Sequence, residues 1–165
     1  MSMLRRSLDY VEGVVDVGII VPICFDNPLK RYAVEFLAEV LSWRKRIIIP
    51  ITAILGTYHI ATRYLRIPKH IVKKILEDLI KTRSPAIYTE ITIAHVLNSL
   101  NYATTYNIES WDGYIVTLAL SLGARVVYSM DKELSKVKEI TVINPFPKDA
   151  IDKYHKYFKA KLRKH

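Results

Sequence analysis

Short runs of β-branched residues alternate along this chain with longer segments whose apolar residues recur at helical spacing. The runs lie at 14–20, 46–50, 86–88, 125–129 and 140–143. Such alternation is typical of a parallel sheet, because parallel strands need a helical crossover between them. We therefore predict an α/β fold with three layers, in which a central parallel sheet carries helices on both faces.

The segments between these runs carry start and stop signals for helices. A Pro or a hydroxyl side chain stands where each helix is expected to start, and Gly123 stands just past the end of one. The expected helices cover 28–45, 52–65, 68–83, 89–106 and 110–122, with a short helix after Asp131.

The length of 165 residues suits one compact domain. We assign residues 1–146 to that domain and residues 147–165 to a basic amphipathic C-terminal helix or tail. Its apolar residues recur at helical spacing among lysines. This helix could dock on the core or help to hold nucleic acid.

The charge balance favours a polyanionic partner. The chain has 25 Lys and Arg against 16 Asp and Glu, a formal net charge of +9, and excess positive charge attracts nucleic acid at long range. RNA or DNA is the leading partner class. The alternative is that the lysines are solvated faces of a heat-adapted (thermophile) protein, since glutamine is absent and Lys, Arg and Ile are plentiful.

The single cysteine, Cys24, cannot form a disulfide within the chain. The apolar run at 47–56 is interrupted by Pro50 and is much shorter than the ~20 residues that span a membrane. We expect a cytoplasmic protein with no membrane segment.

Three aspartates stand at junctions between the expected elements. Asp16 interrupts the first apolar run, Asp112 lies just inside a helix start, and Asp131 follows a strand. A parallel sheet gathers its strand ends and the helix starts that follow them at one edge, so these acids are expected to converge.

Each acid also has a structural interpretation. Asp112 could serve a helix dipole and Asp131 could cap a helix, whereas Asp16 needs a metal or a basic partner. Converging carboxylates would suit Mg²⁺ or Mn²⁺, which prefer oxygen ligands.

The same stretches carry a resemblance to a known family. The residues that carry it are Ser110-Trp111-Asp112-Gly113-Tyr114-Ile115 with Gly123-Ala124, Ser129 and Asp131, and the opening run Val14-Val15-Asp16-Val17. This pattern resembles the PIN-domain family, metal-dependent nucleases that include VapC-type toxins. The resemblance implies an RNA substrate. It also implies that Asp16, Asp112 and Asp131 are the catalytic residues and bind Mg²⁺ or Mn²⁺. An antitoxin protein and a second copy of the chain, in a homodimer, are the partners that it implies.

One departure from the family pattern bears on activity. The family places a metal-binding glutamate six residues after a second-strand proline, and counting from Pro50 leads to Gly56. His59 or Arg63, on the same helical face, could replace that acid, or the two could form a solvated or RNA-facing stripe. The acidic site is therefore predicted to be degenerate.

Two functions follow from these patterns. The first is a divalent-metal-dependent endoribonuclease of PIN type, in the manner of a VapC toxin. The alternative is a catalytically degenerate PIN-like module that binds RNA or a protein.

Tyr102, Tyr106 and Trp111 could stack on bases or belong to the core. A nucleotide-binding domain ranks last, because no glycine-rich phosphate loop is present.

Overall fold

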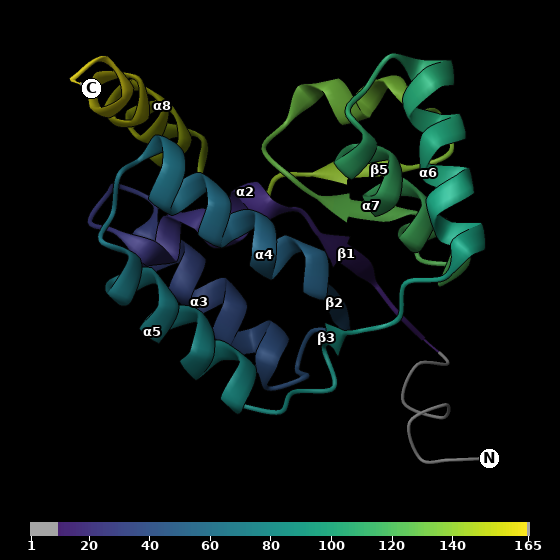
Figure 1. Cartoon of the computed structure of the whole chain (residues 1–165), viewed down its shortest axis with the longest axis horizontal. Coiled ribbons are helices and arrows are strands. Elements are labelled where there is room, and N and C mark those ends of the chain that lie inside the picture. Colours follow the sequence, from purple (N-terminus) through teal and green to yellow (C-terminus); the bar gives the residue numbers. More distant parts are fainter. Residues whose placement is uncertain (1–9, 165) are drawn as a thin grey trace.

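The computed structural model describes residues 10–164, which form a five-stranded sheet with helices on both faces (Figure 1). The strand order is β3-β2-β1-β4-β5, and each neighbouring pair is parallel. The strands are β1 (Gly13–Val15), β2 (Ile47–Pro50), β3 (Ile87–Tyr88), β4 (Val126–Tyr128) and β5 (Thr141–Ile143). The predicted three-layer α/β fold is confirmed.

Alternate residues of the strands face two separate cores. Val14, Ile48 and Val127 are buried in a smaller core, while Val15 and Ile49 are buried in a larger one on the opposite face. Successive side chains of a strand point to opposite faces, so a strand that is apolar throughout must be covered twice. This explains why the strands are continuous apolar runs.

The helices divide between the two cores. The larger core is covered by α2 (Val17–Ile20), η1 (Val21–Cys24), α3 (Lys30–Leu41), α4 (Ile51–His59), its π-helical continuation η2 (Ile60–Tyr64) and α5 (Lys69–Lys81). The smaller core is covered by α7 (Ser110–Ser121), with α6 (Ile93–Tyr106) packed outside it and the short η3 (Lys132–Lys136) beside it. Within residues 10–164 no helix has the length and apolar character needed to cross a bilayer.

Several element boundaries differ from the predictions. The first strand ends at Val15 rather than residue 20, because the Asp16 carboxylate accepts a hydrogen bond from the Val17 N–H and starts α2. The expected helix 28–45 is shorter, since the Asn27 side chain binds the Leu29 N–H in a turn before Lys30.

One further helix start is displaced, and two residues expected to cap helices do not hold the cap position. The helix expected from Thr89 begins later, at Ile93, and is capped by Thr92. Thr52 and Ser110 lie in the first turns of α4 and α7, whose cap positions are Pro50 and Glu109.

The backbones of α6 and α7 approach each other very closely at Gly113. A Cβ atom at this position would lie 2.2 Å from the backbone oxygen of Ser99. No larger residue fits there unless the two helices separate. Gly123, just past α7, has a φ of +70°, which agrees with its predicted role at the helix end.

The C-terminal helix α8 (Lys148–Arg163) is docked on the larger core. Ala150 and Tyr154 are buried in it, and the Phe25 ring lies 6.4 Å from that of Tyr154 and stacks on Tyr157 at 6.2 Å. Of the two predicted roles of this segment, docking on the core is therefore confirmed. The domain boundary at residue 146 stays a prediction.

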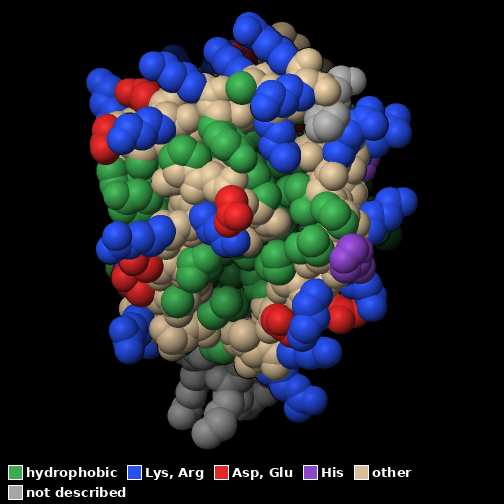
Figure 2. All heavy atoms as spheres, turned by 90° about the vertical axis from the view of Figure 1, so that its left-hand side faces the viewer, with side chains coloured by type: hydrophobic (Ala, Val, Ile, Leu, Met, Phe, Trp, Pro, Cys, Tyr) green, Lys and Arg blue, Asp and Glu red, His purple; other side chains and the backbone are tan. Residues whose placement is uncertain are grey.

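The positive charge is spread over the surface. On the side where α3, α5 and α8 lie in Figure 1, Lys and Arg gather at the top and along both lateral margins, and hydrophobic side chains group between them (Figure 2). Several of the lysines pair with an acid one helical turn away, as Lys73 does with Glu77 and Lys74 with Asp78. Part of the charge therefore serves exposed helix faces, as the alternative interpretation expected.

Candidate active site

Asp16 lies at the C-terminal end of the central strand β1. Its Oδ1 accepts a hydrogen bond of 2.7 Å from the Val17 N–H, and its Oδ2 accepts one of 2.7 Å from the Ser129 hydroxyl. Only 7% of the residue is exposed. Burial raises the pKa of Asp16, the two hydrogen bonds oppose this rise, and the nearby Asp131 and Glu109 carboxylates add to it.

Ser129 connects Asp16 to Asp131. Its hydroxyl donates to Asp16 and accepts a hydrogen bond of 2.9 Å from the Asp131 N–H, while Ser129 itself is 1% exposed. Asp131 Oδ1 caps η3 by accepting the Glu133 N–H at 2.9 Å. The structural role predicted for Asp131 is thus real, and it leaves the second oxygen of that carboxylate available.

Asp112 enters the same pocket from the start of α7. It lies in the first turn of α7 and is half-buried, and within the described part of the chain its side chain accepts no hydrogen bond. Burial raises the pKa of Asp112 to about 7, with repulsion from Asp16, Asp131 and two glutamates adding to the effect. This carboxyl group therefore titrates near neutrality.

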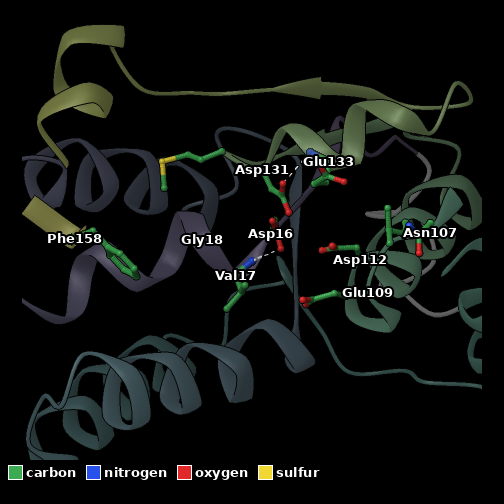
Figure 3. A pocket seen from close by; sticks show the side chains of 11 residues that line it. Asp16, Val17, Gly18, Asn107, Glu109, Asp112, Asp131, Glu133 and Phe158 are labelled. Atoms are coloured by element: carbon green, nitrogen blue, oxygen red, sulfur yellow. Dashed lines mark hydrogen bonds between the residues drawn. The ribbon is translucent and has the colours of Figure 1, made fainter. Parts of the chain in front are cut away.

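The three predicted aspartates line one pocket of about 790 Å³. Figure 3 shows Asp16 at its centre, with Asp112 and Glu109 reaching in from the right of the view and Asp131 and Glu133 lying above. Carboxylates from the end of β1, the loop after β4 and the start of α7 thus meet at the edge of the sheet, where ligands of open α/β folds bind.

The sequence reasoning missed Glu109 and Glu133. Glu109 occupies the cap position of α7, one helical turn before Asp112, and Glu133 follows Asp131 by two residues. The signal for Glu109 was its place just before a helix that carries a predicted site residue. Because the start of α7 faces the pocket, an acid at its cap position shares that pocket.

The pocket has the donor chemistry of a divalent metal site. Among its described lining residues there is no Lys or Arg. Glu133 pairs with Lys136 outside the lining, whereas Asp16, Glu109, Asp112 and Asp131 form no ion pair in the part of the chain that the structure describes. Carboxylate oxygens are ligands that Mg²⁺ and Mn²⁺ accept. Within residues 10–164, however, no three Asp, Glu, His or Cys side chains already form a group that could hold a metal ion. The pocket therefore suits a divalent metal ion by the chemistry of its donor atoms, but the carboxylates are not already spaced as ligands of one ion.

A second, largely apolar groove of about 740 Å³ adjoins the acidic pocket. The two share Asp16, Val17, Glu109, Asp112 and Phe158. Gly56 and His59 of α4 line the groove, and Arg63 is not among its lining residues. The His59 ring meets that of Tyr64 edge-on at 5.6 Å.

Comparison with known proteins agrees with this geometry. The PIN domain family model matches residues 13–140, which is more than half of the chain. The chain therefore belongs to the PIN domain family, whose domains are generally metal-dependent nucleases that act on RNA. No curated protein matches the chain.

Proposed function

We propose that this protein is a divalent-metal-dependent endoribonuclease that hydrolyses RNA phosphodiester bonds at the acidic pocket. The observation that carries the proposal is the convergence of Asp16, Asp112 and Asp131 on one pocket in a chain that belongs to a nuclease family. We propose these three residues as catalytic and metal-binding, with Glu109 as an additional carboxylate.

Each residue has a defined task in this proposal. Asp16 is held rigidly by two hydrogen bonds and fixes the centre of the site. Asp131 is held by its own bond to η3, and Asp112 approaches from the start of α7. A bound Mg²⁺ or Mn²⁺ would activate a water and offset charge on the scissile phosphate. Proton loss from Asp112 near neutral pH would make its carboxylate available as a ligand.

The experiment is a cleavage assay on mixed RNAs with Mn²⁺, with Mg²⁺ and with EDTA. The unmodified chain should cleave RNA only with a metal, and Asp112→Asn should abolish cleavage. Asp78→Asn, which changes an exposed acid paired with Lys74, is the matched control and should cleave normally. Cleavage that persists in EDTA or in Asp112→Asn would refute the proposed site.

The alternative function is a degenerate PIN-like module that binds RNA or a protein without turnover. The observation that favours it is Gly56, which stands beside the site without a side chain where the family resemblance expects an acid. It predicts salt-sensitive RNA binding with no metal-dependent cleavage. A role as a VapC-like toxin would add an antitoxin and a homodimer, and co-purification with a small partner protein would test it.

A further inference from the structure

The apolar groove beside the acidic pocket has the walls of a site for a flat aromatic ligand. Its exposed aromatic residues are Trp111, which is 66% exposed, and Tyr64, which is 55% exposed. His59 stands edge-on to Tyr64, and Phe158 closes the groove from α8. Leu55, which is 70% exposed, lines the same groove, and exposed apolar side chains that gather along one groove mark a binding site.

We propose that this groove binds an unpaired nucleobase of single-stranded RNA and so positions the neighbouring phosphate at the acidic pocket. The inference rests on the proposed function for the identity of the substrate. The base would stack on Trp111, and its neighbours in the groove would exclude water. Stacking platforms of this kind bind bases of any sequence, because every base has a π face.

The position of the groove supports a base in preference to a phosphate. Among its described lining residues there is no Lys or Arg, although the chain carries a net charge of +9. A phosphate would meet no cation there and would lie close to carboxylates. A base is uncharged, and its stacking face suits the apolar walls. Cations elsewhere on the surface would attract the RNA backbone without sequence preference.

The groove is also directly continuous with the site of the proposed chemistry. Trp111 precedes Asp112 in the first turn of α7, and both cavities share Asp16, Glu109 and Asp112. A base held against Trp111 therefore brings its own backbone to the carboxylates. Paired bases inside a duplex cannot enter such a groove, so the structure favours single strands over duplexes.

Gly56 has a positive role in this arrangement. It lines the groove, and a Cβ atom there would lie 3.2 Å from the Cγ2 of Val17, which also lines it. A longer side chain at this position would occupy space that the base needs. The missing side chain thus opens the groove at the same point where the family resemblance expects an acid.

The experiment measures RNA binding in EDTA and again in Ca²⁺, an oxygen-preferring ion that offsets the carboxylate charge beside the groove, and gel electrophoresis verifies that the probe stays intact. The probes are a single-stranded oligoribonucleotide of about 12 nucleotides and the same sequence as a blunt duplex. Trp111 emission is followed in a Trp43→Phe background, so that the exposed tryptophan alone reports. We expect the single strand to quench this emission and the duplex to leave it nearly unchanged.

Variants then separate stacking from general attraction. Because the Trp111 variants lack the reporting tryptophan, their affinity and that of every control is measured by fluorescence anisotropy of a 5′-labelled single strand. Trp111→Ala should weaken binding of the single strand about tenfold or more, and Trp111→Phe should recover most of the loss. Gly56→Gln should also weaken binding, because it fills the groove. Tyr10→Ala is the matched control, since Tyr10 is 65% exposed and lies outside the groove. Far-UV circular dichroism verifies that each variant is folded.

The outcomes distinguish this inference from the nuclease proposal. Unchanged single-strand affinity in Trp111→Ala, equal quenching by the duplex, or no binding by the unmodified chain would overturn the base-binding groove. An intact nuclease with such a result would mean that the groove faces another partner, such as a protein. Binding that depends on Trp111 in a chain that never cleaves would uphold the groove and reject the nuclease proposal.

Discussion

Replacing Asp112 with asparagine should stabilise the metal-free protein at alkaline pH while it abolishes cleavage. Asp112 enters a pocket that already holds the carboxylates of Asp16, Asp131 and Glu109, without a Lys or Arg among the described lining residues. Ionisation of Asp112 is therefore unfavourable in the folded state. The amide has a similar shape and no charge, so it relieves this repulsion.

The size of the effect follows from the pKa of Asp112. Burial and neighbouring carboxylates raise it from 3.8 to about 7, which corresponds to at most about 4 kcal/mol of lost stability. Solvent reaches this half-buried side chain and screens the charges, so we expect about 1–2 kcal/mol. Loss of the favourable interaction with the start of α7, about 0.5 kcal/mol, acts in the opposite direction.

The sign of the pH dependence follows from the raised pKa. Between the unfolded and folded pKa values the folded state binds more protons than the unfolded chain, so stability falls as pH rises through this window. The loss is complete above a pH of about 7. The advantage of Asp112→Asn should therefore be full near pH 8 and clearly smaller near about pH 5.

Guanidinium unfolding followed by circular dichroism, in EDTA at both pH values, measures this difference. Asp78→Asn is the control, because its exposed pair with Lys74 should change stability by no more than about 0.5 kcal/mol. Added Mn²⁺ should stabilise the unmodified chain more than Asp112→Asn. A variant that is less stable than the unmodified chain at alkaline pH in EDTA would refute the repulsion argument.

Three further substitutions test the surroundings of the site. Ser129→Ala should lower the free energy of unfolding by about 1–3 kcal/mol, because the Asp16 carboxylate and a backbone N–H lose their shared partner; Ser121→Ala is the control in the same titration. Gly56→Glu should bind Mn²⁺ more tightly than Gly56→Gln in calorimetry, and equal affinities would contradict a site that lacks one acid. Tyr154→Ala should cost about 3 kcal/mol, since Tyr154 anchors α8 in the larger core, and an unchanged midpoint would mean that α8 is not anchored.

The order of strands and helices could be predicted from the sequence because the central strands β1 and β2 are apolar on both faces. Continuous β-branched runs such as 47–49 leave few alternatives to a covered parallel sheet. Boundaries were less predictable. The first strand was expected to include Asp16, since residues 17–20 are as apolar as 13–15, and only the capping bond of Asp16 ends it. The order of apolar residues does not indicate a hydrogen bond between a side chain and the backbone of the next residue.

The convergence of Asp16, Asp112 and Asp131 was predictable for a different reason. In a parallel sheet the topology alone brings strand ends and helix starts together, so the position of each acid in its element sufficed. Glu109 follows the same rule, because it stands at the start of the helix that carries Asp112. The apolar groove was not predictable in this way, since it depends on how α7, α4 and α8 are rotated and spaced around the sheet edge, and these angles are set by packing.

The close approach of α6 and α7 at Gly113 has a consequence for how this site can change. Gly113 follows Asp112 directly, so the depth to which α7 settles on its neighbour also sets how far its acids extend toward Asp16. A methyl group added at Gly113 would push α7 away from α6. Glu109, Trp111 and Asp112 would then move together, because they lie at the start of the same helix. Substitution of Gly113 alone would therefore change the shape of both the pocket and the groove, although Gly113 is not among the described lining residues of either.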